Sequence, residues 1–274
     1  MRTPRVVHLL AVLVLSITTL IGGGSVRGTG YSIDHSDSWW VSSESGWGLQ
    51  LVQQANVIFA TMYVYDTQNN PVYYTATLDP NPATTDWSGD LYLTHGPWYG
   101  APAYDRAAVA YRKVGQMTVS GDAVQQAQLA YSIDGVAVNK TITRFTLRYD
   151  DYAGTYSGSV LSYAICPTHA PGTVIPVIWY PGTFTITQTE NQLVVAKLSI
   201  AGQSTGCTFT GDYTQFGHLG RSQGTFACKE GTNGTHTFDL MIVQKLGGWK
   251  VASANLTGRD SSGCSISGGI TGIR

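Results

Sequence analysis

The sequence contains few charged residues. Asp, Glu, Lys and Arg make up only 12% of its 274 residues, and the formal net charge is −1. That share is about half the usual value for soluble domains. No basic stripe interrupts this composition, so nucleic acid is not expected as a partner. Hydrophobic residues reach 43%, which excludes a disordered chain and supplies enough apolar surface for one or two cores.

The motifs of the common enzyme classes are also missing. There is no GxSxG elbow, no HExxH helix and no CxxC pair, so we expect no metal and no cofactor. Two pairs of acids, Asp34 with Glu44 and Asp86 with Asp90, have no feature that links them. His218 lies in a GHLG stretch that is typical of an exposed turn. Catalysis is therefore not expected, and a hydrolase with a dispersed site is kept as a minor alternative.

Only one long apolar run is present, LLAVLVLSITTLI from Leu9 to Ile21. Arg2 and Arg5 precede it, and small residues follow at Gly22–Ser25, as in a secretory signal peptide. The run of about thirteen residues is shorter than the roughly 20 residues of a transmembrane helix. We predict a signal peptide over 1–28, without a fixed cleavage site, and no stable membrane anchor. The mature protein is then secreted or periplasmic.

All four cysteines lie in the second half of the chain: Cys166, Cys207, Cys228 and Cys264. An even number in an exported chain favours two disulfides, although four cysteines allow three connectivities. If CTFTGDY and GTFACKEG form a hairpin with Asp212 opposite Thr225, Cys207 lies near Cys228. The remaining pair, Cys166 with Cys264, requires the first and last strands of this half to be neighbours. The pairing therefore supports a sheet that closes on itself.

Alternating apolar and polar residues predict short strands throughout the chain. Glycine and turn dipeptides such as Asp134-Gly135 separate them, and helical periodicity is absent beyond the apolar run, apart from one possible turn near 107–111. A charged stretch at 147–153 separates a domain at 29–146 from a second at 150–274. The fold class is all-β, with two small antiparallel meander barrels, lipocalin- or avidin-like, or a barrel plus a sandwich.

Two predictions of local structure have consequences for the site. The stretch at 29–38 is polar and is expected to be loose. The stretch NVIFATMYVYD, Asn56 to Asp66, has apolar residues on both of its faces. We therefore expect this strand to be covered on both sides or to line a lumen.

Aromatic residues are the best candidates for a binding surface, because ligand pockets combine apolar walls with a few polar groups. The candidate ligand-binding residues are Trp39, Trp40, Glu44, Trp47, Tyr63, Tyr74, Trp98 and Tyr99. The alternative is that these rings only fill a barrel core. The Gly- and Pro-rich loop at 95–105 is the strongest candidate, since loops at a barrel mouth often carry function.

The stretch SWWVSSESGWGLQL, Ser38 to Leu51, has two interpretations. In the first it is a corner of the barrel, where Trp47 continues the inner face that starts the following strand. Glu44 then lies at the rim and accepts a hydrogen bond from a backbone N–H or from the indole of Trp39 or Trp40. In the second interpretation it forms one wall of a pocket, and the Trp98-Tyr99 loop forms the other.

The segment from Trp39 to Phe145 resembles a family of exported proteobacterial β-domains. The shared features are the tryptophan pair, ESGWG, the aromatic YD strand, the Pro turn, LYLTHGPWYG, VGQMTVS and the closing GVAVNKTITRF. This sequence has VYY where relatives often carry a tryptophan. The family has no established activity, so the resemblance implies bacterial export and a compact β-fold. The second half resembles lipocalins and avidins only in general pattern, which carries no function.

These observations favour an exported bacterial binding protein. Its first domain would bind a small apolar or sugar-like ligand, or a protein surface, through aromatic residues at a barrel mouth. The alternative is a structural or interaction module of the cell envelope with filled barrels and no pocket. The partner is therefore an unidentified small ligand or an envelope protein.

Overall fold

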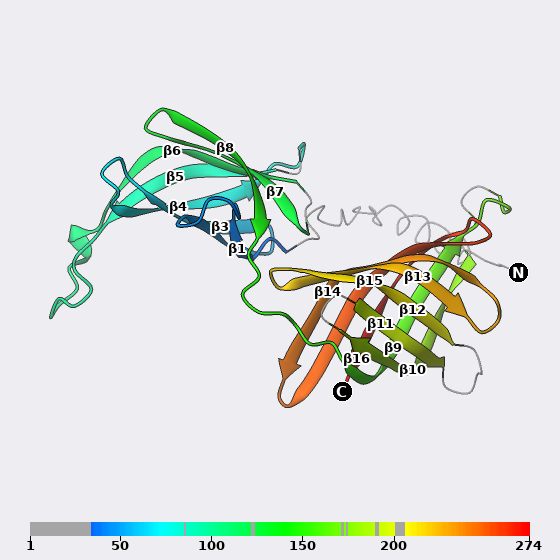
Figure 1. Cartoon of the computed structure of the whole chain (residues 1–274). Helices are drawn as coiled ribbons and strands as arrows, with labels where there is room; N and C mark the ends of the chain where they lie inside the picture. Colours follow the sequence, from blue (N-terminus) through cyan, green and yellow to red (C-terminus); the bar gives the residue numbers. More distant parts are fainter. Residues whose placement is uncertain are drawn as a thin grey trace, which may run out of the picture. The chain divides into compact units, whose positions relative to one another are not determined.

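The computed structural model describes residues 34–274 apart from 85, 122–123, 171–172, 174, 190–191 and 201–205. It is all-β, as predicted, and two closed meander barrels follow one another along the chain (Figure 1). Among the described residues, no helix is long and apolar enough to cross a membrane. The signal peptide predicted over 1–28 lies outside the described residues.

The first barrel contains eight antiparallel strands in chain order. They are β1 (Asp37–Trp40), β2 (Gly48–Gln54), β3 (Val57–Tyr65), β4 (Pro71–Pro80), β5 (Trp87–His95), β6 (Ala110–Ser120), β7 (Gln126–Ile133) and β8 (Val136–Arg144). The barrel closes where β1 pairs with β8, through Trp39↔Arg144 and Trp40↔Thr143. The polar stretch at 29–38 was expected to be loose, but β1 already begins at Asp37, because Asp37 and Ser38 pair with Leu51 and Gln50 on β2.

The second barrel repeats this arrangement with eight further strands. They are β9 (Gly154–Ile165), β10 (Ile175–Gln188), β11 (Gln192–Ile200), β12 (Cys207–Phe216), β13 (Leu219–Cys228), β14 (Asn233–Leu246), β15 (Trp249–Asp260) and β16 (Ser265–Ile273). The ladder closes where β16 pairs with β9, from Ser265↔Ile165 to Ile273↔Ser157. A single 3₁₀ turn, η1 (Arg106–Ala108), interrupts the connection between β5 and β6.

Strand β3 shows how the first barrel divides its residues between two faces. Ile58, Ala60 and Met62 point inward and are fully buried. The alternate residues point outward, and Phe59 and Tyr63 are 48% and 50% exposed. Of the two alternatives predicted for this strand, cover on both sides is wrong, whereas one face does line the barrel interior. Its outer aromatic residues are available to solvent, while smaller aliphatic residues fill the core.

Arg144 fastens the seam of the first barrel. Its side chain is buried, and its guanidinium lies 4.6 Å from the centre of the Trp39 ring. Its Nε donates to the Val124 carbonyl at 2.8 Å, and Nη1 donates to the Asp37 carboxylate at 3.0 Å. Burial lowers the pKa of Arg144, and the Asp37 carboxylate opposes that shift. Because the Arg144 guanidinium has several hydrogen-bond partners, its burial does not destabilise the core, and its contacts connect β8 to β1.

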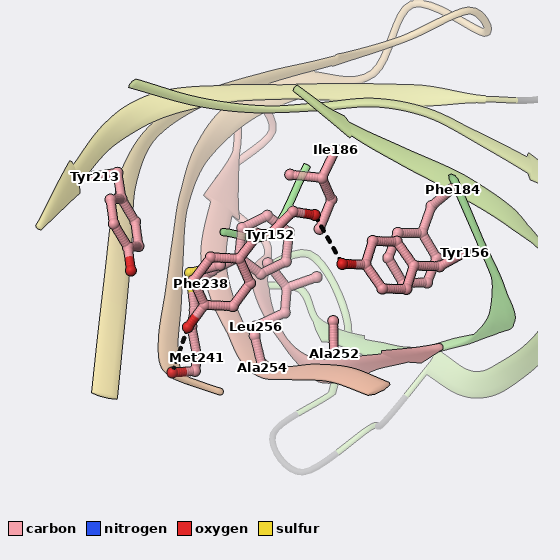
Figure 2. Close-up of a cluster of buried hydrophobic side chains, with 10 residues drawn as sticks. All are labelled: Tyr152, Tyr156, Phe184, Ile186, Tyr213, Phe238, Met241, Ala252, Ala254 and Leu256. Carbon is pink, nitrogen blue, oxygen red and sulfur yellow. Dashed lines mark hydrogen bonds between the residues drawn. The ribbon is translucent and has the colours of Figure 1, made fainter. Parts of the chain in front are cut away.

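A residue from the interdomain segment packs into the core of the second barrel (Figure 2). Tyr152 precedes β9, yet its side chain is only 1% exposed inside the barrel. Its hydroxyl donates to the Met241 carbonyl at 2.9 Å, and its own carbonyl accepts from the Tyr156 hydroxyl at 2.8 Å. Tyr156 also stacks on Phe184 with ring centroids 5.2 Å apart. Tyr152 thus acts as a plug for this core.

Both predicted disulfides are present, Cys166–Cys264 and Cys207–Cys228. The first lies one residue beyond the terminal Ser265↔Ile165 pair, so it staples the seam that closes the barrel. The second joins residues directly opposite each other on β12 and β13. The predicted register of that hairpin is wrong by two residues, because Asp212 faces Gln223 and the tight turn at Gly217-His218 leaves no room for a longer loop.

Candidate functional site

An aromatic groove of about 300 Å³ lies on the outer surface of the first barrel. It crosses β1, β2 and β3 beside the seam. The residues that line it are Ser38, Trp39, Trp40, Ser45, Gly46, Trp47, Gly48, Leu49, Gln50, Tyr63 and Phe145. The groove is open to solvent along its length, so it suits a ligand that is only partly enclosed.

Gly48 forms the floor of this groove. It lies opposite Tyr63 on β3, and the Trp39↔Leu49 register places it beside Trp40 on β1. A Cβ atom added at Gly48 would meet only the Trp39 carbonyl, at 3.6 Å, so the space above the glycine is empty. Neighbouring strands lie about 4.8 Å apart, which places the two flanking aromatic residues roughly 10 Å apart. This spacing leaves room for one ring between them.

Trp47 stands at the end of the groove, where a tight turn enters β2. Gly46 has a φ of +104°, a conformation that L side chains rarely adopt, and this reverses the chain just before the tryptophan. The Tyr65 ring lies 3.3 Å from the position of a Cβ at Gly46 and supports the turn from below. The indole N–H of Trp47 donates to Glu44 Oε2 at 2.9 Å.

Lys140 on β8 completes this corner. Its ammonium forms an ion pair with Glu44 and lies 5.2 Å from the centre of the Trp47 ring. The hydrogen bond from Lys140, together with that from Trp47, holds the pKa of Glu44 below its ordinary value. The Glu44 carboxylate therefore stays ionised at neutral pH and orients the Trp47 indole. Nearby, burial raises the pKa of Tyr131 on β7.

The opposite end of the groove is formed by Trp40 and Phe145. Their rings meet edge to face, with centroids 4.7 Å apart and planes at 75°. The Phe145 N–H donates to the Ser38 carbonyl at 2.8 Å, which holds the residue after β8 against β1. Ser38, Ser45 and Gln50 supply the polar groups of the groove. Aromatic faces combined with a few hydroxyl and amide groups are the usual elements of a small-molecule site.

The structure brings together only part of the predicted set. Trp40, Trp47 and Tyr63 line the groove, and Glu44 fixes Trp47 from outside it. Glu44 was expected to accept from a backbone N–H or from the indole of Trp39 or Trp40, but the indole that reaches it belongs to Trp47. Trp47 also does not continue the buried inner face as predicted, because the Gly46 turn carries it out to the rim, where it is only partly buried.

The other predicted residues do not present their side chains to the groove. Trp39 lies along it, but its ring is buried in the core, where the indole donates to the His35 carbonyl at 3.0 Å. Tyr74 shares the inner parity of Ala76 on β4 and is half-buried. The loop between β5 and β6 does not form the other wall of the groove, because Trp98 and Tyr99 are absent from its lining. Trp98 is 67% exposed and Tyr99 is 95% exposed.

Sequence reasoning missed Phe145 and Gln50 as parts of the site. Phe145 was recognised only as the end of the GVAVNKTITRF segment, and the predicted barrel did not specify which residue after the last strand would meet Trp40. Gln50 is one of several polar residues with outward parity on β2. Gln50 reaches the groove through the pairing of β2 with β1, whereas Phe145 becomes a neighbour of Trp40 through barrel closure, which is a long-range property.

Two of the four acids considered in the sequence form ion pairs with lysines. Glu44 pairs with Lys140, and Asp90 pairs with Lys113 at 2.7 Å. Within the described residues, one group has the geometry to hold a metal ion, Cys207 with Cys228 and Glu230. Its two sulfur atoms are joined in a disulfide and are therefore not thiolate ligands.

Comparisons of the chain with protein-family models, with curated proteins and with solved structures find no match.

Proposed function

We propose that the protein is an exported binding protein whose first barrel holds a small ring-shaped ligand, sugar-like or apolar, in the aromatic groove. The observation that carries this proposal is the empty space above Gly48 between Trp40 and Tyr63. Aromatic faces at this spacing suit a sugar ring, whose C–H groups pack on the rings. The hydroxyls of the sugar would then find Gln50 and Ser38.

Export and a bacterial origin belong to the same proposal. Two disulfides staple the second barrel, as is usual for proteins that fold in an oxidising compartment. The predicted signal peptide and the resemblance of 39–145 to exported proteobacterial domains agree with this. The open groove favours an extended ligand, such as an oligosaccharide, over one that must be fully enclosed.

The test uses a substitution that fills the groove without removing any aromatic residue. Gly48→Val has room for its side chain, and Gly48 has no positive φ to strain. We expect the variant to fold as the wild type does and to lose ligand binding. Tyr63→Ala should also lose binding. Phe59→Ala is the matched control, since Phe59 lies on the same face of β3 with similar exposure but outside the groove.

The ligand is sought in two ways. Native mass spectrometry of protein purified from its own periplasm or medium looks for a co-purified molecule, and tryptophan fluorescence follows titration with an oligosaccharide panel. Binding that survives in Gly48→Val overturns the proposal. Clean ligand-free protein with no fluorescence or thermal response to sugars and apolar ring compounds overturns it as well.

A second candidate function is an interaction module of the cell envelope. It is favoured by the loop between β5 and β6, where Trp98, Tyr99 and Tyr104 are all exposed in the described structure. Aromatic residues on a protruding loop are typical anchors in protein interfaces. Replacement of Trp98 by Ser with loss of a cross-linked envelope partner, and with the groove ligand retained, would support this candidate over the first.

A further inference from the structure

The turn between β14 and β15 has an unusual composition for a hairpin tip. Residues 245–250 read KLGGWK, and Leu246 pairs with Trp249 as the last pair of the ladder. Gly247 and Gly248 have φ values of +55° and +95°, as a two-residue type I′ turn requires. The turn is therefore tight and well defined, and it presents its two apolar residues on one face.

These apolar residues are not covered by the rest of the described chain. Leu246 is 72% exposed and Trp249 is 58% exposed, and every residue from 244 to 249 is exposed. Ile273, at the end of the adjacent strand β16, is 41% exposed. The turn lies at the same end of the barrel as the C-terminus (Figure 1), where Lys250 and Arg274 exchange backbone hydrogen bonds. The apolar surface therefore continues across two neighbouring strand ends.

Positive charge lies close to this tip. Lys245 pairs with Lys250 one step along the ladder from Leu246 and Trp249, so the two lysines point to the opposite face of the hairpin. Arg274 follows Ile273. The acid in contact with them is Asp151, whose carboxylate lies 2.9 Å from Lys250 Nζ. Lys245 and Arg274 are exposed, but the Arg274 guanidinium lies 5.7 Å from the centre of the buried Tyr156 ring, so Lys245 is the exposed cation at the tip itself. A convex apolar tip with cations around it is complementary to a flat anionic surface.

We propose that the β14–β15 turn docks the protein onto an anionic lipid bilayer. Trp249 would lie at the headgroup level, where tryptophan is enriched in membrane proteins, and Leu246 would enter the acyl boundary. Lys245 would face the lipid phosphates, and Arg274 would add long-range attraction from the neighbouring strand end, because each cation near an anionic surface adds to the affinity. This inference rests on the second barrel alone and is independent of the ligand groove.

The experiment is co-sedimentation of the full-length mature protein with vesicles. One set contains phosphatidylcholine mixed with phosphatidylglycerol, and the other contains phosphatidylcholine only. We expect strong binding to the first set, weak binding to the second, and loss of binding as salt is raised. The double variant Leu246→Ser/Trp249→Ser should weaken binding by at least about tenfold. Lys245→Gln should weaken it by about fivefold.

Controls separate this docking from general stickiness and from misfolding. Val136→Ser changes an exposed apolar residue beside the Asp134-Gly135 turn of the first barrel and should leave binding unchanged. Trp98→Ser tests the other exposed tryptophan. Each variant must keep the wild-type unfolding midpoint. Equal binding to both vesicle types, no binding to either, or a loss caused by Trp98→Ser and not by the turn variants overturns the proposal.

Discussion

The indole N–H of Trp47 donates a 2.9 Å hydrogen bond to the carboxylate of Glu44, three residues earlier in the chain. The same carboxylate accepts from Lys140, which approaches from the far edge of the barrel seam on β8. One acid thus ties the turn before β2 to the last strand of the barrel. It also determines which face of the tryptophan is presented to the groove.

This relationship predicts different results for two substitutions of Glu44. Glu44→Gln keeps an oxygen acceptor for the indole but removes the ion pair with Lys140, so Trp47 should stay in place. Glu44→Ala removes both interactions, so the Trp47 emission should shift to the red and groove binding should weaken. The unfolding midpoint should change little in either variant, because the carboxylate is exposed. Fluorescence and thermal unfolding, with Trp47→Phe as the spectral reference, measure these effects.

The contrary outcome has a clear meaning. A large fall in the unfolding midpoint of Glu44→Gln, with ligand binding unchanged, would show that the corner serves architecture only. Trp40, Tyr63 and Gly48 would then have to carry binding without Trp47.

His236 predicts a pH-dependent stability for the second barrel. It is 3% exposed among phenylalanine rings, and burial lowers its pKa from 6.5 to about 4. Since the folded pKa lies below the unfolded pKa, the unfolded chain binds the proton more readily between these values. Stability should therefore fall as pH drops from about 6.5 to 4, by up to about 3 kcal/mol. Urea unfolding across this range measures the effect.

His236→Phe is the control for this titration. It removes the buried imidazole while keeping an aromatic ring beside Phe209 and Phe238, whose centroids lie 5.1 and 5.0 Å from that of His236. The slope of stability against pH should flatten in this range. A variant that retains the full wild-type slope would assign the dependence to another group.

The two disulfides should differ in their contribution to stability. Cys166–Cys264 closes a sequence separation of 98 residues, and Cys207–Cys228 closes 21. On the chain-entropy model, removal of the longer bridge costs about 4 to 5 kcal/mol and removal of the shorter about 3. Paired Cys→Ala variants, compared by urea unfolding, measure both. Thiol labelling of denatured wild type without reductant should find no free thiol, and labelling of two or more cysteines would contradict the staple.

Tyr152 predicts that the interdomain segment contributes to the stability of the second barrel. Tyr152→Phe loses the hydrogen bond to the Met241 carbonyl and should cost about 1 kcal/mol. Tyr152→Ala also leaves a cavity and should cost about 3 to 5 kcal/mol. Tyr149→Ala is the matched control, because Tyr149 is exposed in the same segment. An unfolding midpoint of Tyr152→Ala equal to that of the control would refute the plug.

Much of the architecture could be predicted from local pattern. Alternation gave the strands and the all-β class, and turn chemistry such as Asp134-Gly135 gave their order. Cysteine spacing gave both disulfides, although the hairpin register was two residues out because opposite positions depend on the turn length. The prediction of the Cys207–Cys228 disulfide was correct despite that error, since any antiparallel pairing of these strands brings their ends together.

The site was less predictable, because it depends on closure and on which face points outward. A strand with apolar residues on both sides, such as β3, gives no sign of which face is solvent. Tyr63 therefore could not be assigned to the surface from its neighbours. Nothing in the linear pattern distinguishes Gly48 from the other glycines at strand starts, whereas in the structure it leaves an empty space between two rings. Phe145 reaches Trp40 only when the first and last strands meet.

The Tyr152 plug also decides where the chain can be divided. A fragment that begins at residue 150 carries its own stopper, while one that begins at β9 lacks it. Proteolysis between Asp151 and Tyr152 would likewise separate Tyr152 from the upstream residues that hold the segment in place. The Asp150 N–H donates to the Gln215 side chain, and the Gln215 amide donates to the Arg148 carbonyl. The segment that links the two barrels in sequence therefore folds as the first part of the second barrel.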